Sequence, residues 1–429
     1  MNAARKSLWI INQYAGSRLH GMEYRHFYLA RELVDKGHEV SVLSASYSHL
    51  FTAPPHVTGA RTIEFIDGVR YVWLRVPRYE GNGLHRALNM SIFVLRLLSP
   101  KIRLLPRPTG IIVSSPSPFP ILPAAIWAKL YRARLVFEVR DVWPLTLVAL
   151  GFMSRFHPLV VITRRVERFA YRRADVVASV LPAAVEHMAP LGLAPERFAY
   201  IPNGVALSDF DHAEPLDLRL REALPVGKFI VGHVGTMGPA NALDSLLRAA
   251  AILREESSIL FVLVGSGREK QRLKAEAERL RLSNVLFVDP VPRVQVPALL
   301  RACDALFVGF KRSPLYRLGI SPNKMFDYMY SGRPVVSAVT AANDPVAEAD
   351  CGISVAAEDP QAIAAAVRRL RDMPECERRR LGENGRGYVA RHHSYKELAQ
   401  RYVELFEGTA STVPSELPQS LGDAHVQTG

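Results

Sequence analysis

The segment GISPNKMFDYMYSGRPVV, Gly319–Val336, predicts a helix with an anion-binding N-terminus, followed directly by a buried strand. Ser321 is a favourable N-cap residue, and Pro322 suits the first helical position because its missing N–H needs no partner there. The next backbone N–H groups, on Asn323 and Lys324, then point out of the helix end, where the dipole favours an anion. The Lys324 ammonium adds a full positive charge on the first turn.

Asp327 follows Lys324 three residues later, on the same face of the predicted helix. A phosphate contact with a polar group one turn away suits a nucleoside diphosphate and its ribose. An alternative interpretation is an ordinary capped helix whose Met325, Tyr328 and Met329 pack in a core. This segment alone leaves both interpretations open.

The composition is that of a globular protein with room for two domains. The chain has 429 residues, of which 48% are hydrophobic and 22% charged, which suggests two domains of roughly 200 residues each. Cys303, Cys351 and Cys376 lack the spacing of a metal site or a disulfide framework, so we expect a reducing compartment. The short apolar run near the N-terminus predicts a buried strand rather than a signal peptide, and no segment has the length of a membrane span.

The positive charge is concentrated in the first half of the chain. Of the 54 Lys and Arg and 41 Asp and Glu, 26 and 13 lie at or before Val205, which leaves 28 and 28 after it. In the segment Arg86–Pro108 apolar residues at helical spacing alternate with arginine and lysine: Arg96, Lys101, Arg103 and Arg107. This segment suits an anionic membrane face or an anionic substrate, or it is a solvated helix of a basic protein. No aromatic-rich basic motif indicates nucleic acid.

Short apolar runs alternate with amphipathic segments along the chain, which predicts an α/β fold with parallel sheets covered by helices on both faces. The expected strands of the first half are Leu8–Asn12, Val40–Ser44, Ile111–Ser114, Leu135–Val139, Val176–Ser179 and Ala199–Ile201, with a hairpin of Arg61–Ile66 and Tyr71–Val76. Those of the second half are Phe229–Val234, Leu260–Gly265, Val285–Val288, Ala305–Gly309, Pro334–Ser337 and Gly352–Val355. The pattern therefore predicts two doubly wound domains in series.

Glycines follow several of these strands, at the strand ends where such domains bind ligands. They are Gly16 and Gly21 in the first domain, and Gly235, Gly238, Gly265 and Gly267 in the second. Tight turns need glycine for steric reasons alone. Together with the helix after Ser321, however, they indicate one ligand cleft between two domains.

The order and spacing of these motifs resemble those of the retaining glycosyltransferases of family four. The markers are GMEYRHFYLARELVDKGHEVSVLSA from Gly21, IPNGV from Ile201, the Gly235 loop, VGSGREK and ISPNKMFDYMYSGRPVV. FEVRDVWPLTL, HGMEYR and ANALDSL are similar to a bacterial branch that builds O-antigen, capsule and other surface polysaccharides. The resemblance implies the GT-B fold, two Rossmann-like domains facing across a cleft.

The resemblance also implies a donor site in the second domain and an acceptor site in the first. The donor-binding residues would be Gly235, Thr236, Asn241, Arg268, Ser321, Asn323, Lys324 and Asp327. Lys324 would meet the diphosphate, Asp327 the ribose hydroxyls and Arg268 the phosphates as a second cation. The acceptor-side residues would be Gly16, His20, Gly21 and Arg25, and the catalytic residues Lys324, Asp141 and Arg140.

The sequence departs from the family pattern at several of these positions. The usual pair of glutamates falls on Gly319 and Asp327, and the usual Arg and Lys of the phosphate loop fall on Thr236 and Asn241. Arg140 stands where many members have a histidine. Asp141 either orients the substrates or is a structural carboxylate at a strand end.

The domains expected from the resemblance are an acceptor-side domain (1–205), a connector (206–228), a nucleotide-sugar domain (229–390), a C-terminal helix returning to the first domain (391–408) and a disordered tail (409–429). We expect no cofactor and no metal, although Asp209 and Asp211 have the spacing of a metal-binding triplet.

The resemblance implies that the protein is a hexosyl- or N-acetylaminosugar transferase that uses a nucleotide sugar, with UDP favoured as the nucleotide, and a lipid-linked saccharide as the acceptor. Its expected location is cytoplasmic, peripheral at the inner face of the plasma membrane. A nucleotide-sugar epimerase of the same fold and a non-catalytic nucleotide-sugar-binding scaffold are the alternatives.

Overall fold

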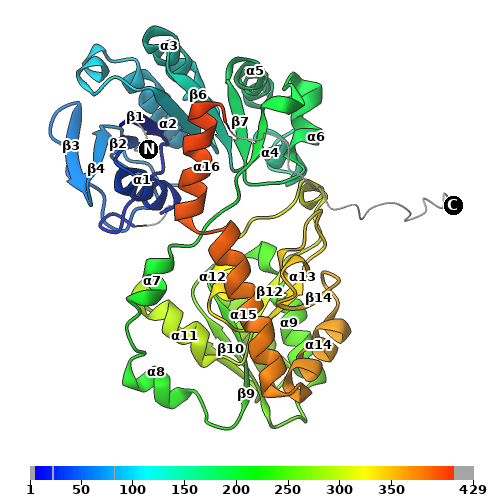
Figure 1. Ribbon diagram of the computed structural model, residues 1–429. Coiled ribbons are helices and arrows are strands. Elements are labelled where there is room, and N and C mark those ends of the chain that lie inside the picture. The colour runs from blue at the N-terminus through cyan, green and yellow to red at the C-terminus, as the bar shows by residue number, and fades with distance from the viewer. Residues whose placement is uncertain (1–4, 22–23, 82, 410–429) are drawn as a thin grey trace. The chain divides into compact units, whose positions relative to one another are not determined.

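The computed structural model describes residues 5–21, 24–81 and 83–409, and the chain divides into two compact units. Unit 1 comprises Met1–Pro202 and Leu398–Gly429, and unit 2 comprises Asn203–Glu397 (Figure 1). The region of the predicted C-terminal helix contains α16, Tyr395–Glu407, which belongs to unit 1 from Leu398 onward. The predicted disordered tail lies outside the described residues from Ala410 to its end.

The described part of unit 1 contains an eight-stranded sheet in the order β3-β4-β2-β1-β5-β6-β7-β8. Neighbouring strands are parallel except β3 and β4, which form the predicted antiparallel hairpin. The strands are β1 Ser7–Ile11, β2 Glu39–Ala45, β3 Arg61–Ile66, β4 Val69–Leu74, β5 Gly110–Ser114, β6 Arg134–Val139, β7 Val176–Ser179 and β8 Phe198–Tyr200. The helices are α1 Arg25–Asp35, α2 Leu84–Leu97, α3 Ile121–Tyr131, α4 Leu145–Ala149, α5 Pro158–Arg173 and α6 Ala184–Met188. The predicted strands of this half are thus confirmed to within two residues at each end.

A buried carboxylate, Glu138 of β6, joins four elements of unit 1. It accepts a hydrogen bond from Arg25 Nε of α1 at 3.0 Å and lies 3.0 Å from His26 Nε2. The hydroxyl groups of Ser114, in β5, and Tyr402, in α16, also donate to it. The C-terminal helix is therefore tied to the sheet by a group that is fully enclosed.

The Glu138 carboxyl stays ionised despite its burial. Burial alone would raise its pKa, but the Arg25 charge and the hydrogen bond with His26 hold the pKa well below the usual value. Because the folded-state pKa is depressed, the cluster stabilises the fold above the unfolded-state pKa, and this stability is lost as the pH falls through the folded-state pKa.

The described part of unit 2 contains a six-stranded, wholly parallel sheet in the order β11-β10-β9-β12-β13-β14. The strands are β9 Phe229–Val234, β10 Ile259–Val264, β11 Val285–Val288, β12 Ala305–Gly309, β13 Val335–Ala338 and β14 Gly352–Val355. The helices that follow them are α9 Leu243–Ile252, α10 Lys270–Arg279, α11 Val296–Ala302, α12 Asn323–Tyr330, α13 Pro345–Glu348, α14 Pro360–Asp372 and α15 Glu375–His392.

Both faces of the unit 2 sheet are buried. In β9, Phe229 and Val231 pack in a cluster with residues of α9 and α14, whereas Ile230 and Val234 pack in another with residues of α11 and α12. The chain runs from β9 outward to β11 and then from β12 outward to β14, so the strand order reverses between β9 and β12. Open α/β sheets bind ligands at such a switch point, beyond the carboxyl ends of the strands.

The predicted connector contains two short helices and belongs to unit 2. They are α7, Leu207–Asp211, and α8, Leu218–Ala223. Each buries one large apolar side chain, Phe210 or Leu220, against the unit 2 core. Within the described ranges, no helix is both long and apolar enough to cross a membrane.

We expect Tyr402→Phe to lower the free energy of unfolding of unit 1 by about 1.5–3 kcal/mol, the scale of a hydrogen bond to a buried charge. The measurement is urea unfolding followed by circular dichroism at pH 7. The matched control is Tyr47→Phe, because Tyr47 also lies in unit 1 but donates to a neutral group, the carbonyl oxygen of Tyr79, at 3.1 Å. Equal effects of the two substitutions would contradict the role given to the Glu138 cluster.

Candidate functional site

The N-terminus of α12 lies at the carboxyl ends of β9 and β12, but its start differs from the prediction. Pro322 occupies the N-cap position and no side chain caps the helix. The Ser321 hydroxyl, predicted to be the cap, instead accepts a hydrogen bond from Asn203 N–H at 2.8 Å. Asn203 Nδ2 also donates to the Ser321 carbonyl oxygen. The N-cap prediction was wrong because Asn203, distant in the sequence, takes the hydroxyl group.

Lys324 is joined to the predicted phosphate loop. Its Nζ donates to Asn241 Oδ1 at 2.7 Å, and Asn241 Nδ2 donates to the Thr236 carbonyl oxygen at 2.8 Å. Burial lowers the pKa of Lys324 to about 8. The structure thus brings the largely buried amine of Lys324 to the loop of Gly235, Thr236 and Asn241, which lies 83 residues or more before it in the sequence.

Two glycine loops meet beside this amine. A Cβ built on Gly265 would lie 2.0 Å from the Gly235 carbonyl oxygen, and one on Gly267 would lie 2.3 Å from the Met237 carbonyl oxygen. Both glycines also have positive φ angles, of 143° and 150°. Two backbone hydrogen bonds join the loops: Gly235 N–H donates to Val264 O, and Met237 N–H donates to Ser266 O. Only glycine permits this close approach of the two loops. The Gly235 loop also lies next to Lys324, whose Cε would be 3.7 Å from a Cβ built on Gly235.

Two buried residues next to the site, Tyr328 and His233, were not identified as site residues from the sequence. The Tyr328 hydroxyl accepts from Val234 N–H and donates to Val234 O, both at 2.7 Å, which fixes α12 against the end of β9. His233 is fully buried, and burial and then the Lys324 charge lower its pKa to about 3, so its ring is neutral. The feature of the sequence that could have drawn attention to His233 is its place inside an apolar strand, FIVGHV.

Arg268, the predicted second cation, is exposed, whereas the nearby Lys270 is buried. Lys270 Nζ donates to Gly265 O at 2.8 Å and Val288 O at 3.1 Å, and pairs with Asp289 at 2.6 Å. Lys270 therefore holds the ends of β10 and β11 together. Asn323, on the first turn of α12, is also exposed.

Asp327, predicted to bind ribose, is paired with an arginine that sequence reasoning did not identify. Arg293 Nη1 donates to Asp327 Oδ2 at 3.0 Å, and Arg293 Nε lies 3.8 Å from Asp209 Oδ2. Asp209, the first acid of the metal-like triplet, thus faces a guanidinium. The feature of the sequence that could have identified Arg293 is its position shortly after β11, at the edge of the sheet where ligands bind in this type of fold.

The predicted acceptor-side loop of unit 1 follows β1. The carbonyl oxygen of Gly16 accepts from the Tyr71 hydroxyl at 2.8 Å. His20 is buried, lies 2.8 Å from Ser17 Oγ, and packs against Trp73. Burial lowers the pKa of His20, an effect that Glu64 partly opposes. Gly21 has a φ angle of 102° and pairs with Phe51 through a β-bridge.

The remaining predicted residues of unit 1 have structural partners. Arg25 is buried against Glu138 and also donates to the carbonyl oxygens of Pro202 and Ile201. The backbone N–H groups of Arg140 and Asp141 both donate to Ser115 Oγ, at 2.8 and 3.2 Å.

Asp141 lies between the end of β6 and α4, whose N-cap residue is Pro144. Its carboxylate accepts hydrogen bonds from Thr146 Oγ1 at 2.7 Å and Trp143 Nε1 at 3.3 Å. A structural role at the strand end is thus evident for Asp141, and its role toward a substrate stays a prediction.

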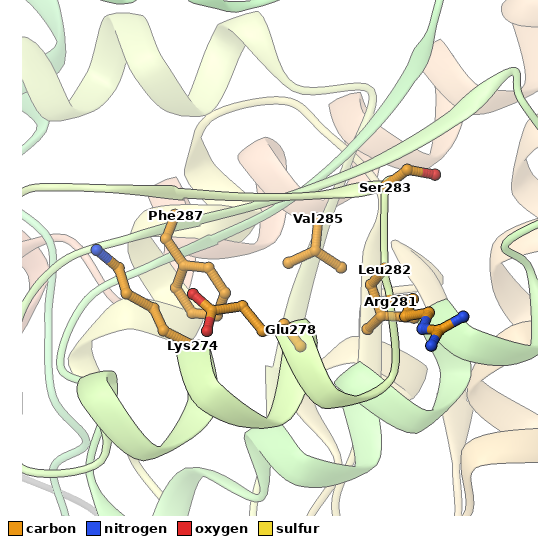
Figure 2. Close-up of a pocket in the computed structure, with 8 residues that line it drawn as sticks. Lys274, Glu278, Arg281, Leu282, Ser283, Val285 and Phe287 are labelled. Atoms are coloured by element: carbon orange, nitrogen blue, oxygen red, sulfur yellow. The ribbon is translucent and has the colours of Figure 1, made fainter.

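A separate pocket of about 500 Å3 lies on unit 2 (Figure 2). Lys274 and Glu278 of α10 and Phe287 of β11 line it. None of the residues predicted for the donor or acceptor lines this pocket, so we do not assign it to the site.

Comparison with known proteins defines the class. Residues 20–204 match the family described as "Glycosyl transferase 4-like domain", and residues 228–372 match "Glycosyl transferases group 1". The protein is therefore a glycosyltransferase, and its two α/β units have the GT-B fold.

Among individual proteins, the chain is similar to WcaI of Escherichia coli (strain K12), named as a glycosyl transferase of colanic acid biosynthesis. The two are 27% identical over 358 residues, which cover 79% of this chain and 85% of WcaI. Sucrose-phosphate synthase from Thermosynechococcus elongatus has a TM-score of 0.72 at 17% identity, covering 94% of this chain and 99% of its own. Anabaena HepE in complex with UDP-glucose has a TM-score of 0.64 at 16% identity, covering 94% and 100%.

We expect Gly265→Ala to lower the free energy of unfolding of unit 2 by about 3 kcal/mol or more, because a methyl group would overlap the Gly235 carbonyl oxygen. The matched control is Gly227→Ala, since Gly227 also has a positive φ angle, 85°, but a Cβ there meets nothing within 4 Å. That control should cost only about 1–2 kcal/mol. Urea unfolding of both variants measures the difference, and equal costs would show that the loop contact is unimportant.

Proposed function

We propose that unit 2 binds a nucleoside-diphosphate sugar and that the protein transfers the sugar, with retention of configuration, to a lipid-linked saccharide. The observation that carries the proposal is Lys324, held at the N-terminus of α12 beside the loop 235–241. An anion there would meet the N–H groups of the first helical turn together with an ammonium. HepE, of the same fold and solved with UDP-glucose, supports UDP as the nucleotide.

In the proposed reaction the bond between the anomeric carbon and the leaving phosphate oxygen breaks, and the acceptor oxygen bonds to the same face of that carbon. Negative charge grows on the departing diphosphate, where Lys324 and the helix N–H groups stabilise it. The acceptor hydroxyl proton passes to the departing phosphate oxygen. The proposal assigns the stabilising charge to these groups and needs no metal.

Asp327 can serve the ribose while it remains paired with Arg293. A carboxylate has about four acceptor positions, and Arg293 occupies two of them through Nη1 at 3.0 Å and Nη2 at 3.4 Å. Two positions remain for ribose hydroxyls. The ion pair fixes the direction of the carboxylate and so would preorganise the nucleoside site.

The acceptor and the location complete the proposal. Unit 1 would recognise the acceptor through the loop Gly16–Gly21, with Arg140 and Asp141 as the groups nearest the transferred sugar. The similarity to WcaI supports a place in cell-surface polysaccharide synthesis. A lipid-linked acceptor implies a cytoplasmic enzyme at the inner face of the plasma membrane, and the sugar would be a hexose or an N-acetylaminosugar.

The decisive experiment incubates the protein with a panel of nucleotide sugars and a lipid-diphosphate-linked sugar, followed by mass spectrometry. A new glycolipid supports the proposal. Interconversion of the donor without an acceptor would instead indicate an epimerase, and nucleotide-sugar binding without turnover would indicate a scaffold.

We expect Lys324→Ala to lower kcat/KM by ~10²-fold or more, the scale of losing one group that stabilises the leaving charge. The matched control is Lys274→Ala, a lysine of the same unit that lines the pocket in Figure 2. Thermal unfolding of both variants checks that the fold is intact. Full activity of Lys324→Ala would refute the assignment.

UDP binding should weaken as the pH rises through about 8, because the buried Lys324 amine then loses its proton. We expect the dissociation constant to rise by ~5-fold from pH 8 to pH 9, because the protonated fraction of an amine with a pKa of about 8 falls from about one half to about one tenth. The rise ends at the higher pKa that the bound anion imposes. Calorimetric titration between pH 6.5 and 9.5 measures this, with Lys324→Arg as the comparison, since arginine stays charged throughout. A profile that is the same in both proteins would exclude Lys324 as the titrating group.

A further inference from the structure

The helix α5 (Figure 1) and the loop 150–157 before it are here called the α5 surface of unit 1. This surface exposes large apolar side chains. Phe152 and Phe156, in the loop, are 70% and 74% exposed. The apolar residues Val161, Ile162 and Phe169 are exposed on the helix itself. Isolated exposed apolar residues are normal in proteins, but a cluster of them with aromatic side chains marks an interaction site.

The same surface carries positive charge without a counter-charge. Between Val142 and Ala174 the chain has six arginines and one acidic residue, Glu167. Glu167 is buried, accepts a hydrogen bond from the Tyr171 hydroxyl at 2.9 Å, and lies 3.1 Å from His187 Nε2. Its carboxylate is therefore turned into unit 1. All six arginines of the segment are exposed, so arginine is its only exposed residue type that is charged at neutral pH, beside the exposed apolar groups and the polar Ser154 and His157.

The apolar and cationic residues of α5 lie on one side of the helix. At 100° per residue, one exposed face is formed by Val161, Ile162, Arg165, Arg168, Phe169 and Arg172. The opposite side, with Val160, Val166 and Ala170, is buried against unit 1. The exposed face of α5 therefore carries both apolar and cationic side chains next to one another.

The loop that carries the two phenylalanines is held in a defined conformation. Phe152 N–H and Met153 N–H both donate to Leu147 O, at 3.0 and 3.2 Å. His157 N–H donates to Ser154 O at 3.0 Å, and the His157 ring accepts from Leu159 N–H at the start of α5. Two exposed phenyl rings are therefore presented by a locally hydrogen-bonded turn, so less conformational freedom is lost on binding.

The neighbouring helix α3, which packs against α5, extends this surface. Its Leu122, Ile126 and Leu130 are four residues apart and exposed, and Lys129 lies beside them.

We propose that the α5 surface docks on an anionic lipid bilayer, with Phe152 and Phe156 inserted among the acyl chains and the arginines at the lipid phosphates. A bilayer offers an apolar layer beneath an anionic one, which matches both features of the surface. A nucleic acid offers phosphates but no apolar layer for aliphatic side chains such as Val161 and Ile162. This inference deepens the proposed use of a lipid-linked acceptor. Asp141, a predicted acceptor-side residue, lies eleven residues before Phe152 and is tied to α4 through Thr146.

The test is co-sedimentation of the full chain with vesicles, without any substrate. The wild-type protein should bind phosphatidylglycerol–phosphatidylcholine vesicles and bind phosphatidylcholine vesicles far more weakly. We expect Phe152→Ser with Phe156→Ser to weaken binding to the anionic vesicles by ~10-fold or more. Replacing Arg164, Arg165, Arg168 and Arg172 together by Gln should weaken it by ~100-fold or more.

Matched variants elsewhere on the chain control for general effects. Phe65→Ser with Leu218→Ser removes two similarly exposed apolar groups, 64% and 68% exposed, from outside the α5 surface. Replacing Arg254, Arg279, Arg379 and Arg380 by Gln removes four exposed charges from unit 2. Neither control should change vesicle binding by more than about twofold, because neither removes a group that meets the bilayer.

Unchanged vesicle binding in both α5 variants, or equal binding of the wild type to neutral vesicles, would overturn the inference. If the wild-type protein bound none of the vesicles, the inference would also be overturned. A protein would then be the remaining candidate partner for this surface. UDP binding, measured separately by calorimetry, should be unaltered in both α5 variants. Loss of vesicle binding with intact UDP binding supports the inference independently of the donor assignment, and failure of UDP binding in the wild type would challenge only the proposed function.

Discussion

The candidate donor site of unit 2 depends on the close approach of two loops at the carboxyl ends of β9 and β10. The Gly265 backbone lies so near the Gly235 carbonyl oxygen that even a methyl group would overlap it. With the loops this close, the loop 235–241 lies next to α12, and the Lys324 amine donates to Asn241. The largely buried cation, the helix N-terminus and the loop thus lie together in one arrangement that no single segment contains, and this is where we propose that the donor phosphates bind.

Two buried charged groups illustrate two different uses of burial. Glu138 is fully enclosed and accepts from Arg25, Ser114 and Tyr402, so its charge is matched inside unit 1. For Lys324, whose ammonium has three donors, the described residues supply one hydrogen bond, to Asn241. Burial with so little compensation lowers its pKa and leaves it suited to an anion from outside the protein. The first arrangement stabilises a fold, and the second is the kind found at functional sites.

Local pattern was enough to predict the strands, but it did not reveal side-chain partners that come from far along the chain. Buried parallel strands are short apolar runs bounded by glycine or polar residues, so their positions were predicted closely. Ser321 was predicted as a helix cap, but its hydroxyl accepts from Asn203. Arg25 was predicted to face the acceptor, yet it is buried against Glu138, more than a hundred residues away. Asp327 was predicted to bind the ribose hydroxyls, and its ion pair with Arg293 was not predicted.

The sequence by itself determined the α/β class, the doubly wound pattern and the residues from which an anion site in unit 2 could be built, because these depend on periodicity, glycine and helix-end chemistry. Only the tertiary structure decided which of those residues meet. It joined Lys324 to Asn241 and paired Asp327 with Arg293. It also turned Glu167 inward, so that the outer side of α5 is cationic and apolar. The physical reason is that hydrogen bonds and ion pairs act over a few ångströms in space, and separation along the chain does not reveal that distance.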